Sequence, residues 1–187
     1  MSTARYKNYK SNNIKNAQPG YAPNAFLTPI SWLDTEADVV GNAAAGDRVT
    51  IDSSHVWTTD HGAIQVYCVP GTNEGDADVV GETLAKRYAH KPKLIIAGDS
   101  AELLDMALGI LNESFILHSK DSECNALGYV QHGCGCDPCI VNTGSFKSGK
   151  LSDGRKQYEF ELLTYHKYFY NGILTVIDDA ADILATE

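Results

Sequence analysis

Alternation of apolar and polar residues is the feature that most constrains the fold of this chain. In the segment Tyr158–Leu162 every second residue is apolar, and the residues between are glutamates. Successive side chains of a β-strand point to opposite faces, so this period of two predicts a strand with one buried face. The same reasoning predicts strands at residues 48–51, 63–69, 93–97, 114–118 and 158–169, with a hairpin turn at Asn171-Gly172 leading into a last strand at 173–177.

One segment has a strong helical pattern instead. Asp99 is suited to cap a helix, and Glu102 follows three residues later as in a capping box. The apolar residues that follow have helical spacing and predict one stripe packed on a sheet: Leu103, Leu104, Ala107, Leu108 and Leu111. The acidic stretch Asn73–Asp78 is predicted to be a solvated loop. The expected fold is therefore mainly β, of the α+β type: an antiparallel β-barrel or sandwich with one principal α-helix.

Residues 1–24 are expected to form an extended N-terminal arm, followed by a single β-rich domain at 25–187. The arm is polar and ends in Pro19–Pro23, so it has too little apolar surface to fold alone. Its aromatic and basic side chains could anchor it on another surface. The predicted assembly residues of the arm are Arg5, Tyr6, Lys7, Tyr9, Lys10, Lys15 and Tyr21.

Charge is distributed unevenly along the 187 residues, which contain 15 basic and 24 acidic side chains and have a net charge of −9. Residues 1–15 contain four of the basic residues and no acid, which leaves 11 basic against 24 acidic residues in the remainder. Nucleic-acid binding gains affinity from Lys and Arg on phosphates, so we do not expect the acidic body to bind DNA. No segment predicts a membrane span or a signal peptide, which favours a cytosol-like compartment.

Five cysteines are present, and three of them lie in the short segment Cys134–Cys139. In a reducing compartment they are expected to be thiols or metal ligands before disulfides. A structural zinc site would use Cys124, Cys134, Cys136 and Cys139, with His132 as a neighbour. The alternatives for these cysteines are ordinary thiols and redox or disulfide chemistry. The chain as a whole is expected to have no cofactor, with structural zinc as the alternative.

Catalytic signatures are weak, and the chain is not expected to be an enzyme. Gly144–Lys150 matches the start of a phosphate-binding loop, but Leu151 stands where a hydroxyl should reach magnesium. The six histidines are scattered, and none has an evident nucleophile beside it.

A resemblance is carried by several short segments taken in order: Pro23–Phe26, Ser31-Trp32, Gly46–Ile51, Leu94–Leu104, Tyr129–Gln131 and Gly144–Gly149. Together, over about residues 22–178, they resemble structural proteins of tailed bacteriophages of the tail-tube or head-to-tail ring type. The cysteine cluster is not part of that pattern. The resemblance implies a β-barrel or sandwich flanked by one helix, assembled into rings around a DNA channel, with arms and long loops that bridge neighbouring subunits.

The function expected from this resemblance is that of a virion structural protein forming a ring or tube in a tail or neck. Its partners would be copies of itself and neighbouring tail or neck proteins, and genomic DNA would pass without specific binding. It would lie in the virion, and in the host cytoplasm during assembly, with no membrane partner. The alternatives are a small zinc-binding adaptor domain organised by the Cys134/Cys136/Cys139 loop and a capsid decoration protein.

Overall fold

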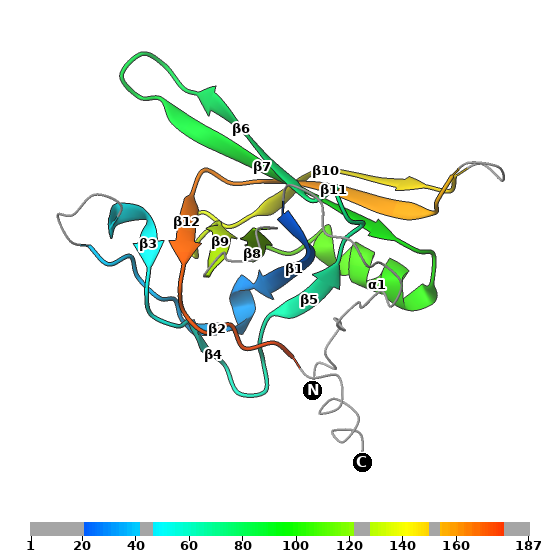
Figure 1. Cartoon of the computed structure of the whole chain (residues 1–187), viewed down its shortest axis with the longest axis horizontal. Helices are drawn as coiled ribbons and strands as arrows, with labels where there is room; N and C mark the ends of the chain where they lie inside the picture. The colour runs from blue at the N-terminus through cyan, green and yellow to red at the C-terminus, as the bar shows by residue number, and fades with distance from the viewer. Residues whose placement is uncertain (1–20, 42–46, 122–127, 150–153, 178–187) are drawn as a thin grey trace.

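The computed structural model describes residues 21–41, 47–121, 128–149 and 154–177 (Figure 1). The strands are β1 (Tyr21–Pro29), β2 (Leu33–Thr35), β3 (Thr50–Ile51), β4 (Val56–Trp57), β5 (Ile64–Tyr67), β6 (Glu74–Val80), β7 (Arg87–Ala97), β8 (Phe115–Asp121), β9 (Tyr129–His132), β10 (Ile140–Lys147), β11 (Gln157–Leu163) and β12 (Lys167–Tyr170). The helices are α1 (Ala101–Ile110) and two 3₁₀ turns at Ile30–Trp32 and Asp47–Val49. The chain is thus mainly β with one principal α-helix in its described part, as the sequence predicts.

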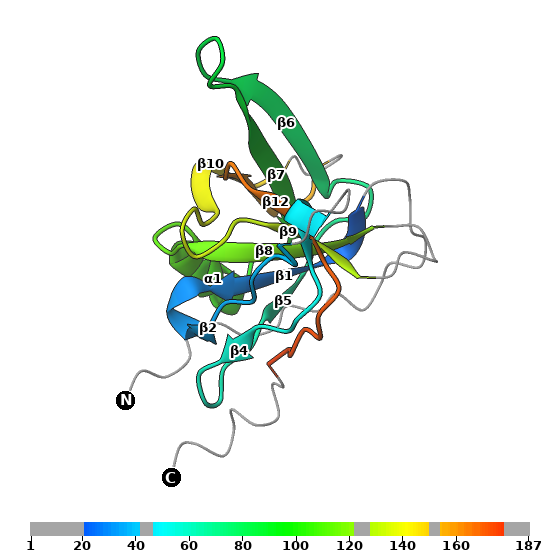
Figure 2. The same cartoon turned by 90° about the vertical axis from the view of Figure 1, so that its left-hand side faces the viewer.

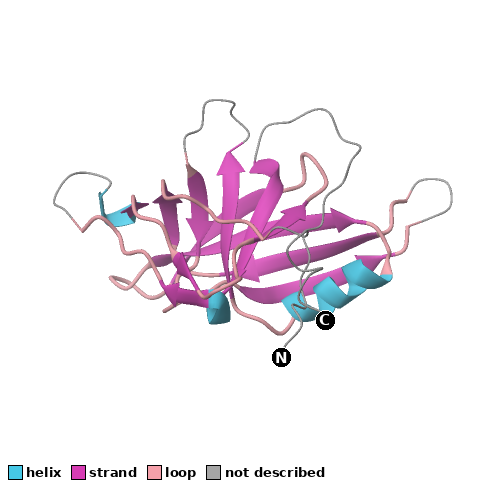
Figure 3. Cartoon of the chain, turned by 90° about the horizontal axis from the view of Figure 1, so that it is seen from below, coloured by secondary structure: helices cyan, strands magenta, loops and turns pink. Residues whose placement is uncertain are grey.

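Two open sheets form the body (Figure 3). The six-stranded sheet has the order β3-β12-β9-β8-β1-β5, and the four-stranded sheet has the order β10-β11-β7-β6. All strand pairs in both sheets are antiparallel except the parallel pair β12 and β3. A small two-stranded sheet pairs β2 with β4. Both larger sheets end in edge strands, so the described strands are packed open sheets and not a closed barrel.

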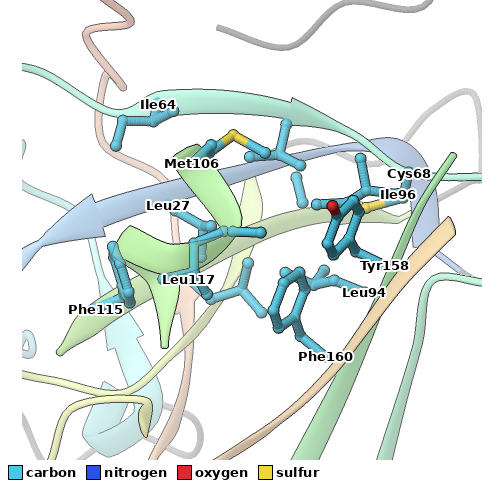
Figure 4. Packing of buried hydrophobic residues seen from close by; sticks show 14 of the residues in the cluster. Leu27, Ile64, Cys68, Leu94, Ile96, Met106, Phe115, Leu117, Tyr158 and Phe160 are labelled. Carbon is cyan, nitrogen blue, oxygen red and sulfur yellow. The ribbon is translucent and has the colours of Figure 1, made fainter. Parts of the chain in front are cut away.

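The main core lies where these two sheets and helix α1 meet (Figure 4). The six-stranded sheet contributes Leu27 and Leu117, the four-stranded sheet contributes Leu94 and Phe160, and α1 contributes Met106. All five side chains are buried to within 4% of full burial. Burying apolar side chains stabilises the fold by roughly 1.5–3 kcal/mol each, so this cluster determines how the sheets and the helix are joined.

Helix α1 begins one residue later than the capping pattern predicts. Ser100 is the N-cap, because its hydroxyl accepts a hydrogen bond from the Leu103 amide at 3.2 Å. The Asp99 carboxylate accepts instead from the Lys156 ammonium. Both side chains are short acceptors suited to the position, and the extended backbone of Ser100 places its oxygen over the first turn.

Strand β6 corrects the prediction of a solvated loop at Asn73–Asp78. Glu74 through Val80 pair residue by residue with Lys93 through Arg87 of β7. Strand β11 pairs with β7 only from Lys93 onward, so the rest of β6 and β7 extends as a two-stranded ribbon (Figures 1 and 2). The ribbon has no buried β6 face, and for that reason its sequence lacks the apolar alternation that reveals other strands.

The predicted hairpin at Asn171-Gly172 is also wrong. The Asn171 amide donates to the Ile51 carbonyl at 2.8 Å, and residues 173–177 form no strand but an isolated parallel bridge between Val176 and Ala63. A Cβ on Gly172 would lie 2.4 Å from the Ser53 carbonyl oxygen, so this glycine permits a close backbone approach and does not form a turn. Strands β11 and β12 belong to different sheets.

The folded domain begins inside the predicted arm. Tyr21–Asn24 are the first residues of β1, and Asn24 pairs with Tyr67 of β5. The Tyr21 hydroxyl lies 3.4 Å from His132 Nε2, and its ring occupies the space that a side chain on Gly75 would need. Tyr21 is therefore packed within its own domain. The other predicted arm residues, Arg5, Tyr6, Lys7, Tyr9, Lys10 and Lys15, lie outside the described residues.

Candidate functional site

Three parts of the surface and interior carry unusual chemistry. The first is the end of the β6–β7 ribbon, where apolar side chains have no cover in the described structure. Val79, Leu84 and Tyr88 are 59%, 101% and 57% exposed, and we call them the hairpin tip. Val79 and Tyr88 are directly paired across the strands, so they share a face. Leu84 also has a φ of +74°, a left-handed conformation that costs energy for a residue with a Cβ.

Exposed ion pairs hold the ribbon straight at its base. Lys91 pairs with Asp78 at 2.7 Å, and Lys93 pairs with Glu74 at 3.3 Å. Each pair joins β7 to β6 across the ladder, and such exposed pairs are screened by water and contribute little to stability. At the tip, Lys86 is exposed, and the Arg87 guanidinium lies 3.6 Å from the centre of the Tyr165 ring.

The second feature is an apolar groove between α1 and strand β10. Leu104, Leu108 and Leu111 of the helix are 46%, 53% and 46% exposed, and Phe146 of β10 is 46% exposed. These four residues, which we call the α1 groove, line a pocket of about 150 Å³ together with Ala107, Gly144, Ser145, Tyr158 and Phe160. A Cβ on Gly144 would lie 3.2 Å from Leu111 Cδ2, so the small residue brings the strand close to the helix.

The groove corrects the sequence prediction of a single apolar stripe on α1. Leu103 and Ala107 are buried in the core, together with Met106 and Ile110. The other predicted stripe residues lie beside this buried face and line the pocket over the core residues Ala107, Tyr158 and Phe160. The apolar surface of α1 is thus wider than its buried face, and among the described residues its remaining edge is partly exposed.

In Figure 1 the free end of the β6–β7 ribbon lies at the upper left and helix α1 lies to the right, so the hairpin tip and the helix of the α1 groove are on different sides of the molecule. Figure 2, turned by 90°, shows the ribbon rising clear of the body. The turn at the tip contains charges of both signs, because Glu82 and Lys86 are both exposed there. The two surfaces therefore have in common that both are apolar.

The third feature is the cysteine loop between β9 and β10. Cys134 and Asp137 exchange two backbone hydrogen bonds of 3.1 Å, which close a tight turn around Gly135 and Cys136. The Asp137 carboxylate accepts from the Tyr165 amide at 2.7 Å and from His166 Nδ1 at 2.9 Å. These bonds fix the end of the turn to the β11–β12 connection.

The structure separates the cysteines that the sequence groups together. The Cys139 thiol is buried in the main core and donates to the His132 carbonyl at 3.2 Å, and burial raises its pKa. The thiols of Cys134 and Cys136 hydrogen-bond to each other, and Cys136 is exposed. Cys124 lies outside the described residues. Among those described, no three His, Cys, Asp or Glu side chains already converge on one point.

A hollow of about 130 Å³ lies beside this thiol pair. Its lining includes Cys134, Cys136, Tyr168, Glu36 and Asp38. The Glu36 carboxylate accepts a 2.7 Å hydrogen bond from the Gly135 amide, in the middle of the turn. Burial, followed by the hydrogen bond to Cys136, raises the pKa of Cys134 to about 11. Burial and the neighbouring thiols raise the pKa of Tyr168 to about 12.

A buried polar cluster lies on the face of the six-stranded sheet opposite the main core. Gln131 accepts from His55 Nε2 and from His118 Nε2, both at 3.1 Å, and donates to the Gly133 carbonyl at 3.0 Å. The Ala37 amide donates to His55 Nδ1, which leaves the proton of His55 on Nε2. The Tyr170 ring stacks on His55 at 4.8 Å. Burial lowers the pKa of His118 to about 3. The sequence did not predict this cluster, because isolated histidines such as His55 and His118 have no distinguishing pattern.

Comparisons with known proteins add no relative to this description: no family model, no curated protein and no solved structure matches the chain. No helix in the described ranges is long and apolar enough to cross a membrane. Fold and site thus define a mainly β protein with a projecting ribbon, an exposed apolar groove and a thiol pair on one loop.

Proposed function

We propose that the protein is a non-catalytic structural subunit that assembles head to tail into a ring or tube, in the tail or neck of a bacteriophage particle. The observation that carries this proposal is the pair of exposed apolar surfaces on different sides of the molecule. A contact between two different patches on identical subunits repeats from copy to copy. Such contacts close into rings when the rotation permits and otherwise continue as filaments.

The hairpin tip has the form of an inserting element. A fully exposed leucine on a projecting loop gains nothing in the isolated subunit, whereas burial in a partner removes it from water. Its left-handed backbone adds a conformational cost that contacts with a partner would offset. The α1 groove offers leucine and phenylalanine side chains around a pocket that suits an aliphatic or aromatic anchor.

Charge supports the channel in this proposal. The excess of acidic residues after residue 15 would repel a DNA backbone. DNA could then pass through a ring or tube without binding it. The assignment to a phage tail or neck rests on the resemblance of the sequence segments.

Two surface variants test the assembly. Leu84→Asp changes the hairpin tip and Leu108→Asp changes the α1 groove, and each places a charge in an apolar contact at a side chain that is more than half exposed. We expect each to weaken self-association of the full-length protein by at least about 10-fold, measured by sedimentation velocity over a concentration series. Ile173→Asp is the matched control, since Ile173 is 77% exposed but belongs to neither surface.

The proposal fails if wild-type protein stays monomeric at every concentration and is also absent from purified particles. It fails equally if the Ile173→Asp control loses association as strongly as the two variants. Where the wild type does assemble, electron microscopy distinguishes rings and tubes from irregular aggregates.

A further inference from the structure

The hollow beside the cysteine loop has a geometry suited to a ligand that is independent of the assembly surfaces. The turn Cys134–Asp137 presents two cysteines that are two positions apart, and a hydrogen bond joins their thiols. Glu36 reaches the same turn from a distant part of the sequence through its bond to the Gly135 amide. A side chain at position 135 would displace this carboxylate, since a Cβ there would lie 2.7 Å from Glu36 Oε2.

The charges around the hollow favour a cation. Its ionisable lining groups are two thiols, the Tyr168 phenol, and the carboxylates of Glu36 and Asp38, and no Lys or Arg lines it in the described part of the chain. Each of these groups is neutral or negative. A bound cation would therefore be attracted by the carboxylates of Glu36 and Asp38 and meet no positive side chain in the described lining, whereas an anion would be repelled.

We propose that the hollow binds one thiophilic divalent cation of the zinc and cadmium class, with Cys134 and Cys136 as thiolate ligands and the Glu36 carboxylate as the third protein ligand. On binding, the two thiols release their protons to water and no electron is transferred. The volume of about 130 Å³ is several times the roughly 30 Å³ that one water occupies in the liquid, so the space admits an ion with a water ligand.

This ligand set differs from the four-cysteine zinc site that the sequence suggests. Cys139 is excluded because its thiol donates to the His132 carbonyl inside the main core, where it is fully buried. The carboxylate takes the place of further sulfur, a donor combination that divalent zinc accepts. Because the side chains do not yet converge on one point, the ion would draw Glu36 and the two thiols together.

Cadmium titration of the full-length, reduced protein tests the site, because the ultraviolet charge-transfer band grows with the number of bound thiolates. We expect one Cd²⁺ per chain and a band of the size given by two thiolates. Cys134→Ser and Cys136→Ser should each lower the affinity by more than the about 10–100-fold typical of lost outer-shell partners. Glu36→Gln should weaken binding and leave the band of the saturated site unchanged. Circular dichroism checks that each variant is folded.

Matched controls come from the remaining cysteines. Cys68→Ser, Cys124→Ser and Cys139→Ser should leave the band unchanged. A band of three or four thiolates, a loss of binding in Cys124→Ser or in folded Cys139→Ser, or no cadmium uptake would overturn the proposal. These results are separate from the assembly test, since the hollow shares no residue with the hairpin tip or the α1 groove.

Discussion

Neighbouring leucines of helix α1 differ sharply in burial. Leu103 is 1% exposed and belongs to the main core, whereas its neighbour Leu104 is 46% exposed and lines the α1 groove. A leucine removed from water in the monomer stabilises the fold, and a leucine left in water is available to a partner. The comparison separates the residues that hold this protein together from those that we propose hold copies of it to one another.

The largest expected effect is on the buried side of the helix. Leu103→Ala should lower the free energy of unfolding by about 2–5 kcal/mol, because it removes buried methyl groups and leaves a cavity. Leu104→Ala should change it by no more than about 0.5 kcal/mol, as expected for an exposed position. Urea unfolding of both variants at one pH gives the comparison directly.

Equal losses in the two variants would contradict the separation of the two sides. A large loss in Leu104→Ala alone would show that the groove is a part of the monomer core. The slope of the unfolding curve should be the same in both variants if only stability has changed.

A second effect is expected from pH, and it should act on the fold. Burial lowers the pKa values of His118 and His132 to about 3. In the unfolded chain the pKa of histidine is near 6.5. The preference of these two sites for neutral histidine therefore stabilises the folded state fully above about pH 6.5, and this stabilisation is lost as the pH falls toward 3. We expect the free energy of unfolding to fall by on the order of 2 kcal/mol for each of the two histidines between pH 7 and pH 5.

His118→Asn should flatten this pH profile, and urea unfolding at several pH values measures it. The Leu104→Ala variant is the control, and its profile should run parallel to that of the wild type. A wild-type stability that is constant from pH 7 to pH 5 would mean that the buried histidines take up protons without cost.

Local pattern was sufficient to predict much of the fold. Alternation identified β5 and β11, and a cap signal followed by helical spacing identified α1 within two residues. These elements each bury one face, and burial of one face is what produces a period in the sequence. The general class, mainly β with one helix, followed from them.

Other parts left no such trace. Strand β6 is exposed along nearly its whole length, so its acidic residues look like a loop. A glycine is required at position 172 because the Ser53 carbonyl and the Tyr170 ring occupy the space that a Cβ would need. The sequence around Gly172 does not reveal this close approach. Helical spacing predicted the apolar residues of α1 as one buried stripe. Spacing alone does not show which of them the rest of the protein covers, so the exposed α1 groove was not predicted.

The candidate sites were only partly predictable for the same reason. Cysteine spacing drew attention to Cys134 and Cys136, but the burial of Cys139 and the arrival of Glu36 depend on long-range packing. The buried cluster of His55, His118 and Gln131 likewise forms only when β8, β9 and a distant loop meet. The candidate sites of this chain therefore depend on tertiary contacts more than on local motifs.

Head-to-tail assembly is tested most directly by mixing the two surface variants. Leu84→Asp retains an intact α1 groove and Leu108→Asp retains an intact hairpin tip, so one groove can accept one tip and the chain of contacts stops there. We predict that each variant alone is monomeric and that the mixture forms a 1:1 heterodimer by native mass spectrometry, with nothing larger. A mixture that remains monomeric while the wild type assembles would contradict the contact between hairpin tip and groove.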